Sequence, residues 1–382
     1  MTSVEGDLEH KSTPVAHMPQ LDGLRALAIL CVLVWHFVED ANALHEFVQW
    51  GWVGVRLFFV LSGFLITGIL LKCRRGIQSE NHSGWWTLRN FYIRRFLRIF
   101  PIYYAFILSL YLFLPRFRED IGWYVTYLQN VMFALDNQYS VGPHLWTLAV
   151  EEQFYLVWPF LILFLPQRWL LPSILLSIAL GPVSRLAALS FHCTSFSAMM
   201  LTPSNMDTLA MGALLAFLAS NKSDAWTRTF SRRCLSVGLP IIVAYVVCHN
   251  LGFARVSKTE QSPAEWVLFV FADFGAALTY TCVVYYAAKG FGGTLGRLLS
   301  CRAMVYVGKI SYGLYVFHHP VQEALNEIIF PRLGWQLPQS SLATFFLYSF
   351  VTFLLAAASW HIVERPINSL KHLFPYIHRA PE

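Results

Sequence analysis

Long apolar segments recur along the whole chain, and polar stretches separate them. Ten of these segments reach about twenty residues, the length that a helix needs to cross the hydrocarbon of a bilayer. A further segment, 120–137, mixes aromatic and polar residues and predicts an interfacial or a re-entrant helix. The pattern predicts an all-α integral membrane protein, a single bundle of about ten transmembrane helices. The ten predicted spans are 19–38, 52–71, 97–114, 146–165, 168–184, 206–220, 235–253, 265–288, 303–325 and 342–363, of which the fifth and sixth look short or broken.

The composition agrees with this architecture. Hydrophobic residues make up 56% of the 382 residues and charged residues 13%, whereas soluble domains contain about 25% charged residues. The bundle leaves little of the chain for a large soluble domain. We therefore expect a cytoplasmic N-terminal segment over 1–18, a membrane domain over 19–366 and a cytoplasmic tail over 367–382.

The distribution of Lys and Arg predicts the orientation, because basic residues concentrate in cytoplasmic loops. The loop 72–98 contains seven basic residues and one acid, whereas the loop 39–51 contains three acids and no Lys or Arg. Both termini are therefore expected in the cytoplasm, with the protein in the plasma (bacterial inner) membrane among its lipids. The same loop bias accounts for the net charge of +6, so we expect no nucleic-acid partner.

The seven cysteines are scattered, without the spacing of a disulfide framework or of a zinc site. We expect neither a metal ion nor a permanently bound cofactor. The sequence predicts no particular oligomeric state.

The first span, LDGLRALAILCVLVWH (21–36), carries three ionisable residues, Asp22, Arg25 and His36. Charged residues inside a membrane are costly and mark functional sites. Arg25 and His36 are eleven positions apart, which brings them within about 20° of one helix face and about 16 Å apart along the axis. Asp22 precedes Arg25 by one turn and is expected to pair with it.

Polar residues also occur inside other spans. With the first span running outward, Glu151 falls close to the level of His36, which predicts a catalytic pair. Arg95 and Arg98 fall near the cytoplasmic side with Arg25. The remaining polar positions that we expect to bind substrate or support the site are Arg56, Tyr155, Asp207, Ser311, Tyr312 and His318.

Some of these residues have simpler interpretations. Arg56 would lie near the outer surface, where its side chain can extend to lipid headgroups. His318 and its neighbour His319 would each be able to hydrogen-bond an adjacent span instead of acting on a substrate. His45 and His144, in outer segments, are expected to be ordinary interfacial residues.

This arrangement suggests acyl transfer between compartments. A histidine beside a carboxylate can take a proton from an incoming hydroxyl group. Guanidinium groups bind phosphates through paired hydrogen bonds. A donor with a phosphorylated head and a long thin arm, such as an acyl-coenzyme A thioester (acyl-CoA), would dock at the arginines and extend its acyl group towards His36.

Several motifs resemble the acyltransferase type 3 membrane family, which includes sugar O-acetyltransferases of surface polysaccharides. The resemblance covers essentially the whole chain, and the motifs follow in the family's order. They are LDGLRALAILCVLVWH (21–36), GVRLFFVLSGFLIT (54–67), RRFLRIFPIYY (94–104), HLWTLAVEEQFYLVWP (144–159), ISYGLYVFHHPV (310–321) and IVERPI (362–367).

The resemblance implies acyl-CoA as the donor, for which we expect acetyl-CoA, and a sugar hydroxyl at or beyond the outer face as the acceptor. It implies a catalytic role for His36, donor handling by Arg25, and supporting roles for Glu151, Arg95, Arg98 and Tyr155. The chain departs from the family in two places. Ala149 stands where the family often has Ser, with Thr147 as a candidate replacement, and Arg56 stands where the family often has Asp.

Two alternatives stay open from the sequence. In the first, the protein is an acyltransferase whose acceptor is a hydrophobic small molecule or a lipid reached from the cytoplasmic side. In the second, it is a transporter, and the layer of ionisable residues is the path of the coupled ion. The chain shows no internal repeat, which speaks against the transporter. A covalent acyl-histidine intermediate is a variant of the enzymatic mechanism.

Overall fold

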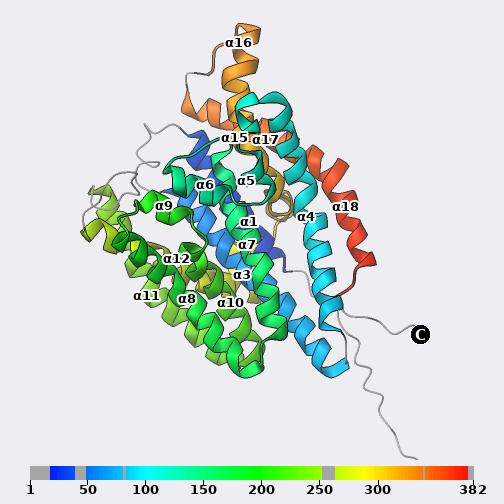
Figure 1. The fold of residues 1–382 in the computed structure, drawn as a ribbon, viewed down its shortest axis with the longest axis vertical. Coiled ribbons are helices and arrows are strands. Elements are labelled where there is room, and N and C mark those ends of the chain that lie inside the picture. Colours follow the sequence, from blue (N-terminus) through cyan, green and yellow to red (C-terminus); the bar gives the residue numbers. More distant parts are fainter. Residues whose placement is uncertain (1–17, 39–48, 81–82, 252–262, 339, 377–382) are drawn as a thin grey trace, which may run out of the picture.

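The computed structural model describes residues 18–38, 49–80, 83–251, 263–338 and 340–376. Every regular element in these ranges is a helix, so the all-α prediction is confirmed (Figure 1). Residues 1–17 and 377–382, which fall in the two predicted cytoplasmic ends, lie outside the described residues, as does the acidic loop from 39 to 48 with His45.

Eight helices in the described ranges are long and apolar enough to cross a bilayer. Each matches one of the predicted spans, and the fifth span is one continuous helix, α8, not a broken one. These helices are α1 (Pro19–Phe37), α3 (Trp50–Glu80), α4 (Gly84–Phe113), α7 (Trp146–Phe164), α8 (Gln167–Ser190), α11 (Asp224–Asn250), α12 (Pro263–Lys289) and α17 (Ser341–Ser359).

The sixth and ninth predicted spans form shorter helices. The sixth is α10 (Met206–Asn221), whose side chains from Asp207 to Leu218 are all buried. Since protein encloses α10, its length need not match the thickness of the bilayer. The ninth is divided at Ile310 into α14 (Arg302–Lys309) and α15 (Ser311–Ala324).

The aromatic segment 120–137 is helical but divided. It forms α5 (Ile121–Val125) and α6 (Gln129–Asp136), and Tyr127 between them has a φ of 55°. The other short elements are η1 (Pro115–Arg118), η2 (Pro143–Leu145), α9 (Ser195–Met200), η3 (Pro203–Asn205), α13 (Gly293–Leu299), η4 (Leu325–Ile329), α16 (Phe330–Leu333), η5 (Trp360–Glu364), α18 (Arg365–Ser369) and η6 (Leu370–Leu373).

Helices α3 and α10 cross at two glycines. A Cβ atom on Gly63 would lie 1.8 Å from the carbonyl oxygen of Leu209, and one on Gly212 would lie 2.0 Å from that of Val60. Small residues of this kind let helix backbones approach closely inside a membrane. The close crossing fixes α3, which carries one wall of the pocket described below.

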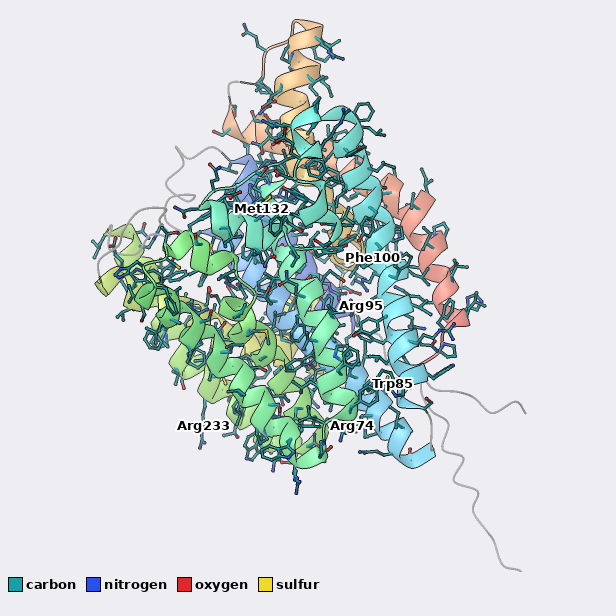
Figure 2. The ribbon with its side chains drawn as sticks, viewed as in Figure 1. Arg74, Trp85, Arg95, Phe100, Met132 and Arg233 are labelled. Atoms are coloured by element: carbon teal, nitrogen blue, oxygen red, sulfur yellow. The ribbon has the colours of Figure 1, made fainter. Side chains whose placement is uncertain are left out.

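Large apolar side chains are exposed on the outer helices, including Leu112 and Phe113 on α4 and Phe346 and Phe350 on α17. Such a surface suits contact with lipid. Basic residues lie at one end of the molecule: Figure 2 shows Arg74 of α3 and Arg233 of α11 there, with Met132 towards the other end and Arg95 between them.

Candidate functional site

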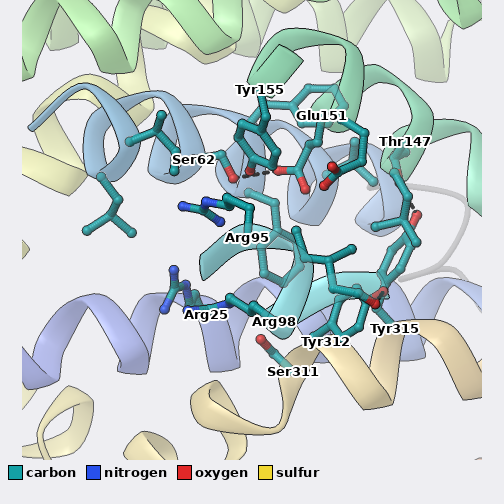
Figure 3. Close-up of a pocket in the computed structure, with 18 residues that line it drawn as sticks. Arg25, Ser62, Arg95, Arg98, Thr147, Glu151, Tyr155, Ser311, Tyr312 and Tyr315 are labelled. Carbon is teal, nitrogen blue, oxygen red and sulfur yellow. Dashed lines mark hydrogen bonds between the residues drawn. The ribbon is translucent and has the colours of Figure 1, made fainter. Parts of the chain in front are cut away.

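A pocket lies between α1, α3, α4, α7 and α15 (Figure 3). Seven of the residues predicted from the sequence line it together, although they come from four helices. They are Arg25, Arg95, Arg98, Glu151, Tyr155, Ser311 and Tyr312. The structure therefore gathers most of the predicted site around one cavity.

Three arginines form one end of this pocket. Arg25 makes an ion pair with Asp22 at 3.2 Å, which confirms the predicted one-turn pairing. Arg95 and Arg98 project from adjacent turns of α4, and the Arg95 guanidinium lies 4.7 Å from the centre of the Tyr155 ring. Figure 3 shows the three guanidinium groups on the same side of the cavity. This end suits an anionic ligand group.

Two carboxyl side chains, Glu151 and Glu152, line the same pocket. The Ser62 hydroxyl donates a hydrogen bond to Glu151 Oε1 at 2.5 Å and so fixes the orientation of that carboxylate. The sequence reasoning did not single out Ser62. Its position inside the motif 54–67 was the available signal.

Thr147 and Tyr315 close the opposite end. The Tyr315 hydroxyl donates to the backbone oxygen of His144 at 2.8 Å and lies 2.6 Å from Thr147 Oγ1. Thr147 therefore provides a hydroxyl in the pocket two residues before Ala149. The Tyr315 ring packs against two imidazoles, with its centre 5.7 Å from that of His144 and 5.5 Å from that of His318.

Four imidazoles gather behind Tyr315, and we call His36, His144, His318 and His319 the histidine cluster. The ring centre of His318 lies 4.8 Å from that of His36 and 4.8 Å from that of His144. The ring centre of His319 lies 5.8 Å from that of His36 and 5.5 Å from that of His144.

The structure places His144 in the interior, whereas the sequence predicts an interfacial position. His144 is 4% exposed in η2 and packs within the histidine cluster, so its prediction as an ordinary interfacial residue is wrong. The reason is tertiary: α15 covers the short turn that carries it, and the backbone oxygen of Val316 lies 3.3 Å from its Nε2.

The predicted pair of His36 and Glu151 stays a prediction. His36 packs against His318 and His319, whereas Glu151 bonds to Ser62 and lines the pocket beside the arginines.

Arg56 and Asp207 lie in a buried ionic network, not among the residues that line the pocket. Arg56 is 1% exposed, so its expected extension to lipid headgroups is wrong. Its Nε lies 2.6 Å and its Nη2 2.8 Å from the two carboxylate oxygens of Asp273. Arg185 pairs with Asp207 and, at 3.2 Å, with Asp273.

This network balances two arginines with two aspartates and joins α3, α8, α10 and α12. A buried charge needs an ionic partner and further hydrogen bonds. Arg56 has such a bond, because its Nη1 donates to Asn205 Oδ1 at 2.5 Å. The sequence analysis missed Arg185 and Asp273. Asp273 lies inside the predicted span 265–288, and Arg185 directly follows the predicted span 168–184. A charged residue in or beside an apolar span was the signal that could have found both.

Among the residues that the structure describes, no group of three or more His, Cys, Asp or Glu side chains could hold a metal ion. The side chains in and around the pocket provide guanidinium groups at one end and imidazoles packed against Tyr315 at the other.

Comparisons with known proteins identify the family of the chain. A family model described as an acyltransferase domain matches residues 18–361. The chain is 30% identical over 379 residues to the peptidoglycan O-acetyltransferase OatA of Listeria monocytogenes, which covers 92% of this chain and 56% of that protein. It is 27% identical over 381 residues to the O-acetyltransferase OatA of Staphylococcus aureus, covering 92% of this chain and 57% of that one. No solved structure matches.

The chain thus spans little more than half the length of these curated relatives. The family match itself extends over nearly all of the chain, from the start of α1 to η5, and it includes both ends of the pocket. On that ground, this chain belongs to the acyltransferase domain family.

Proposed function

We propose that the chain is a membrane-embedded O-acyltransferase that transfers an acyl group from acyl-CoA to a hydroxyl group of a glycan. The acyl group that we propose is acetyl. The observation that carries the proposal is the pocket, which extends from three arginines to Tyr315, against which the histidine cluster packs. The names of the relatives, which are O-acetyltransferases, support the reaction class and the glycan acceptor.

The donor would bind at the arginine end. Acyl-CoA carries several phosphate groups, and Arg25, Arg95 and Arg98 offer planar guanidinium groups that bind phosphate through paired hydrogen bonds. The basic residues of 72–98, a segment predicted as a loop but formed by the end of α3 and the start of α4, would hold this end towards the cytoplasm, where acyl-CoA is found. The pantetheine arm would then lie along the pocket.

The transfer would occur at the histidine end. His36 takes the proton of the acceptor hydroxyl while that oxygen attacks the thioester carbonyl, and a new C–O bond forms. The C–S bond then breaks, and the departing thiolate takes the proton from the His36 imidazolium, which yields the O-acyl ester and coenzyme A. Glu151, oriented by Ser62, would stabilise the positive charge that develops on the imidazole.

The first test removes the proposed base. We expect His36→Ala to lower acetylation of surface glycan by about 10²- to 10⁴-fold, the usual contribution of a general base. The measurement is the O-acetyl content of cell-surface glycan from cells that express each variant, determined by mass spectrometry. The matched control is His361→Ala, because His361 is an exposed histidine that stacks on Tyr306, outside the pocket.

Normal acetylation by the His36→Ala protein at normal expression would contradict the proposal. A loss of acetylation in the control as well would point to a general effect of removing any histidine, and would also count against a catalytic role for His36.

A further inference from the structure

A hydrogen bond to the backbone determines which ring nitrogen of His318 carries the proton. It is 0% exposed, and its Nδ1 lies 2.6 Å from the backbone oxygen of Tyr315 one turn earlier in α15. A carbonyl oxygen only accepts hydrogen bonds, so Nδ1 must carry the proton in the neutral ring. The lone pair of His318 therefore belongs to Nε2, on the side of the ring away from its own helix backbone.

His144 is arranged in the opposite sense. It is 4% exposed, and its Nε2 lies 3.3 Å from the backbone oxygen of Val316. The same reasoning gives the proton to Nε2 and the lone pair to Nδ1. Two neighbouring imidazoles thus use different nitrogens to hold the backbone of α15, and each keeps one basic nitrogen for another purpose.

These two basic nitrogens, His318 Nε2 and His144 Nδ1, are buried and have no hydrogen-bond partner among the described residues. Leaving a buried acceptor unpaired costs about 1–3 kcal/mol, and buried polar groups in folded proteins are nearly always paired. The His318 ring lies beside a residue that already has a proposed role, since its centre is 4.8 Å from that of His36. The His144 ring lies on His318 in turn, with the two ring centres 4.8 Å apart.

We propose that His144 Nδ1 and His318 Nε2 form a subsite that binds hydroxyl groups of the acceptor and holds it beside His36. This inference rests on the proposed acyltransferase function. Because both nitrogens accept hydrogen bonds, the ligand must donate, and a sugar with neighbouring hydroxyl groups meets that requirement. A carboxylate or phosphate group, which only accepts, is excluded from this position.

The opposite arrangement of the two rings provides a test. The amide of Asn reaches the position of a histidine Nδ1, and the longer Gln reaches that of Nε2. His318→Gln therefore keeps an acceptor at the free position, whereas His318→Asn keeps only the bond to the Tyr315 oxygen. At His144 the pattern is exchanged: His144→Asn keeps the free acceptor, and His144→Gln keeps only the bond to Val316.

We expect His318→Asn and His144→Gln to raise the KM for the acceptor at least about tenfold, the loss of one good hydrogen bond. We expect His318→Gln and His144→Asn to change it by less than about threefold, because an acceptor atom is kept. The KM for acetyl-CoA should stay unchanged in all four variants. A purely structural role gives the reverse order in each pair, because only the bonds to the backbone would then matter.

The assay uses the full chain in proteoliposomes with radiolabelled acetyl-CoA, and methyl glycosides as acceptor probes. A deoxy analogue that lacks one neighbouring hydroxyl group is the second probe. We expect His318→Asn and His144→Gln to lose less against the deoxy probe than against the complete glycoside. An equal loss with both probes would mean that the nitrogens hold only a buried water, and would overturn the subsite.

The reverse order within the pairs, or equal effects within each pair, would overturn it as well. Failure of the underlying function has a different signature, because the wild-type chain would then transfer no acetyl group to either probe. Elution of each variant as a single peak in gel filtration serves as the check on folding.

Discussion

Arg95 carries both a charge and a packing contact. Its guanidinium lies over the Tyr155 ring at 4.7 Å while it lines the pocket with Arg25 and Arg98. Stacking holds the planar group in one orientation, so that its N–H groups remain available for a ligand. Lysine would supply the charge without the plane, and it is therefore an informative replacement.

We expect Arg95→Gln to raise the KM for acetyl-CoA by about 10- to 100-fold, because hydrogen bonds to charged groups contribute about 1.5–3 kcal/mol. Arg95→Lys should recover part of this loss. The measurement is initial transfer rate against acetyl-CoA concentration. Arg75→Gln is the control, since Arg75 is exposed on α3 and does not line the pocket. Equal KM values for the Arg95 and Arg75 variants would refute donor binding by Arg95.

Helix α3 connects the site to the rest of the bundle. Ser62 faces the pocket and orients Glu151, and the next residue, Gly63, meets the backbone of α10. The buried ionic network binds α3 through Arg56 to α12, and through Asp273 to Arg185 on α8. Removing one member of such a network leaves an uncompensated buried charge, so its role is to fix the relative positions of these helices.

The crossing of α3 and α10 gives a prediction for a pair of glycines in one helix. Gly63→Ala should destabilise the protein by about 1–3 kcal/mol, because the new methyl group would overlap the Leu209 carbonyl. Gly68→Ala should be neutral or stabilising by up to about 1 kcal/mol, because no atom lies within 4 Å of a Cβ atom there and alanine favours the helix. Thermal unfolding of the purified protein in detergent measures both. A similar change in Tm for the two variants would show that close helix contact at Gly63 is not required.

The whole molecule has two ends of different character. Arg74 and Arg233 lie at one end (Figure 2). Near the other lie α6 and α9, joined by hydrogen bonds from Ser197 to the Ala134 oxygen at 2.7 Å and from Thr194 to Asn137 at 2.5 Å. The positive-inside rule predicts that the basic end faces the cytoplasm. Donor and acceptor would then approach the pocket from opposite compartments.

This orientation is testable with the natural cysteines. Cys193 is exposed in the turn between α8 and α9, and a membrane-impermeant maleimide should label it in intact cells. Cys193→Ser should abolish that labelling. Ser79→Cys in the Cys193→Ser background should react only after the cells are permeabilised, because Ser79 lies at the basic end of α3. Labelling of the Ser79→Cys protein in intact cells would reverse the predicted orientation.

Most of the helices and the local part of the site could be predicted from the sequence. Runs of apolar residues specify spans such as α1 and α8, because a segment of that length must satisfy its backbone hydrogen bonds internally in a membrane. Spacing along one helix predicted the pairing of Asp22 with Arg25, and motif residues such as Arg95 and Tyr155 were found by their resemblance to the family. The arginine end of the pocket could therefore be predicted from the sequence.

The tertiary structure alone decided which residues from different helices meet. It brought Ser62 to Glu151, 89 residues apart, and Arg56 to Asp273, 217 residues apart. It also brought His144 on η2 to His318 on α15. Helix periodicity fixes which face of a segment is polar, but not which neighbour that face contacts, because many bundle arrangements bury the same apolar surface. The histidine cluster depends on that choice, and for this reason its four members are brought together only in the folded chain.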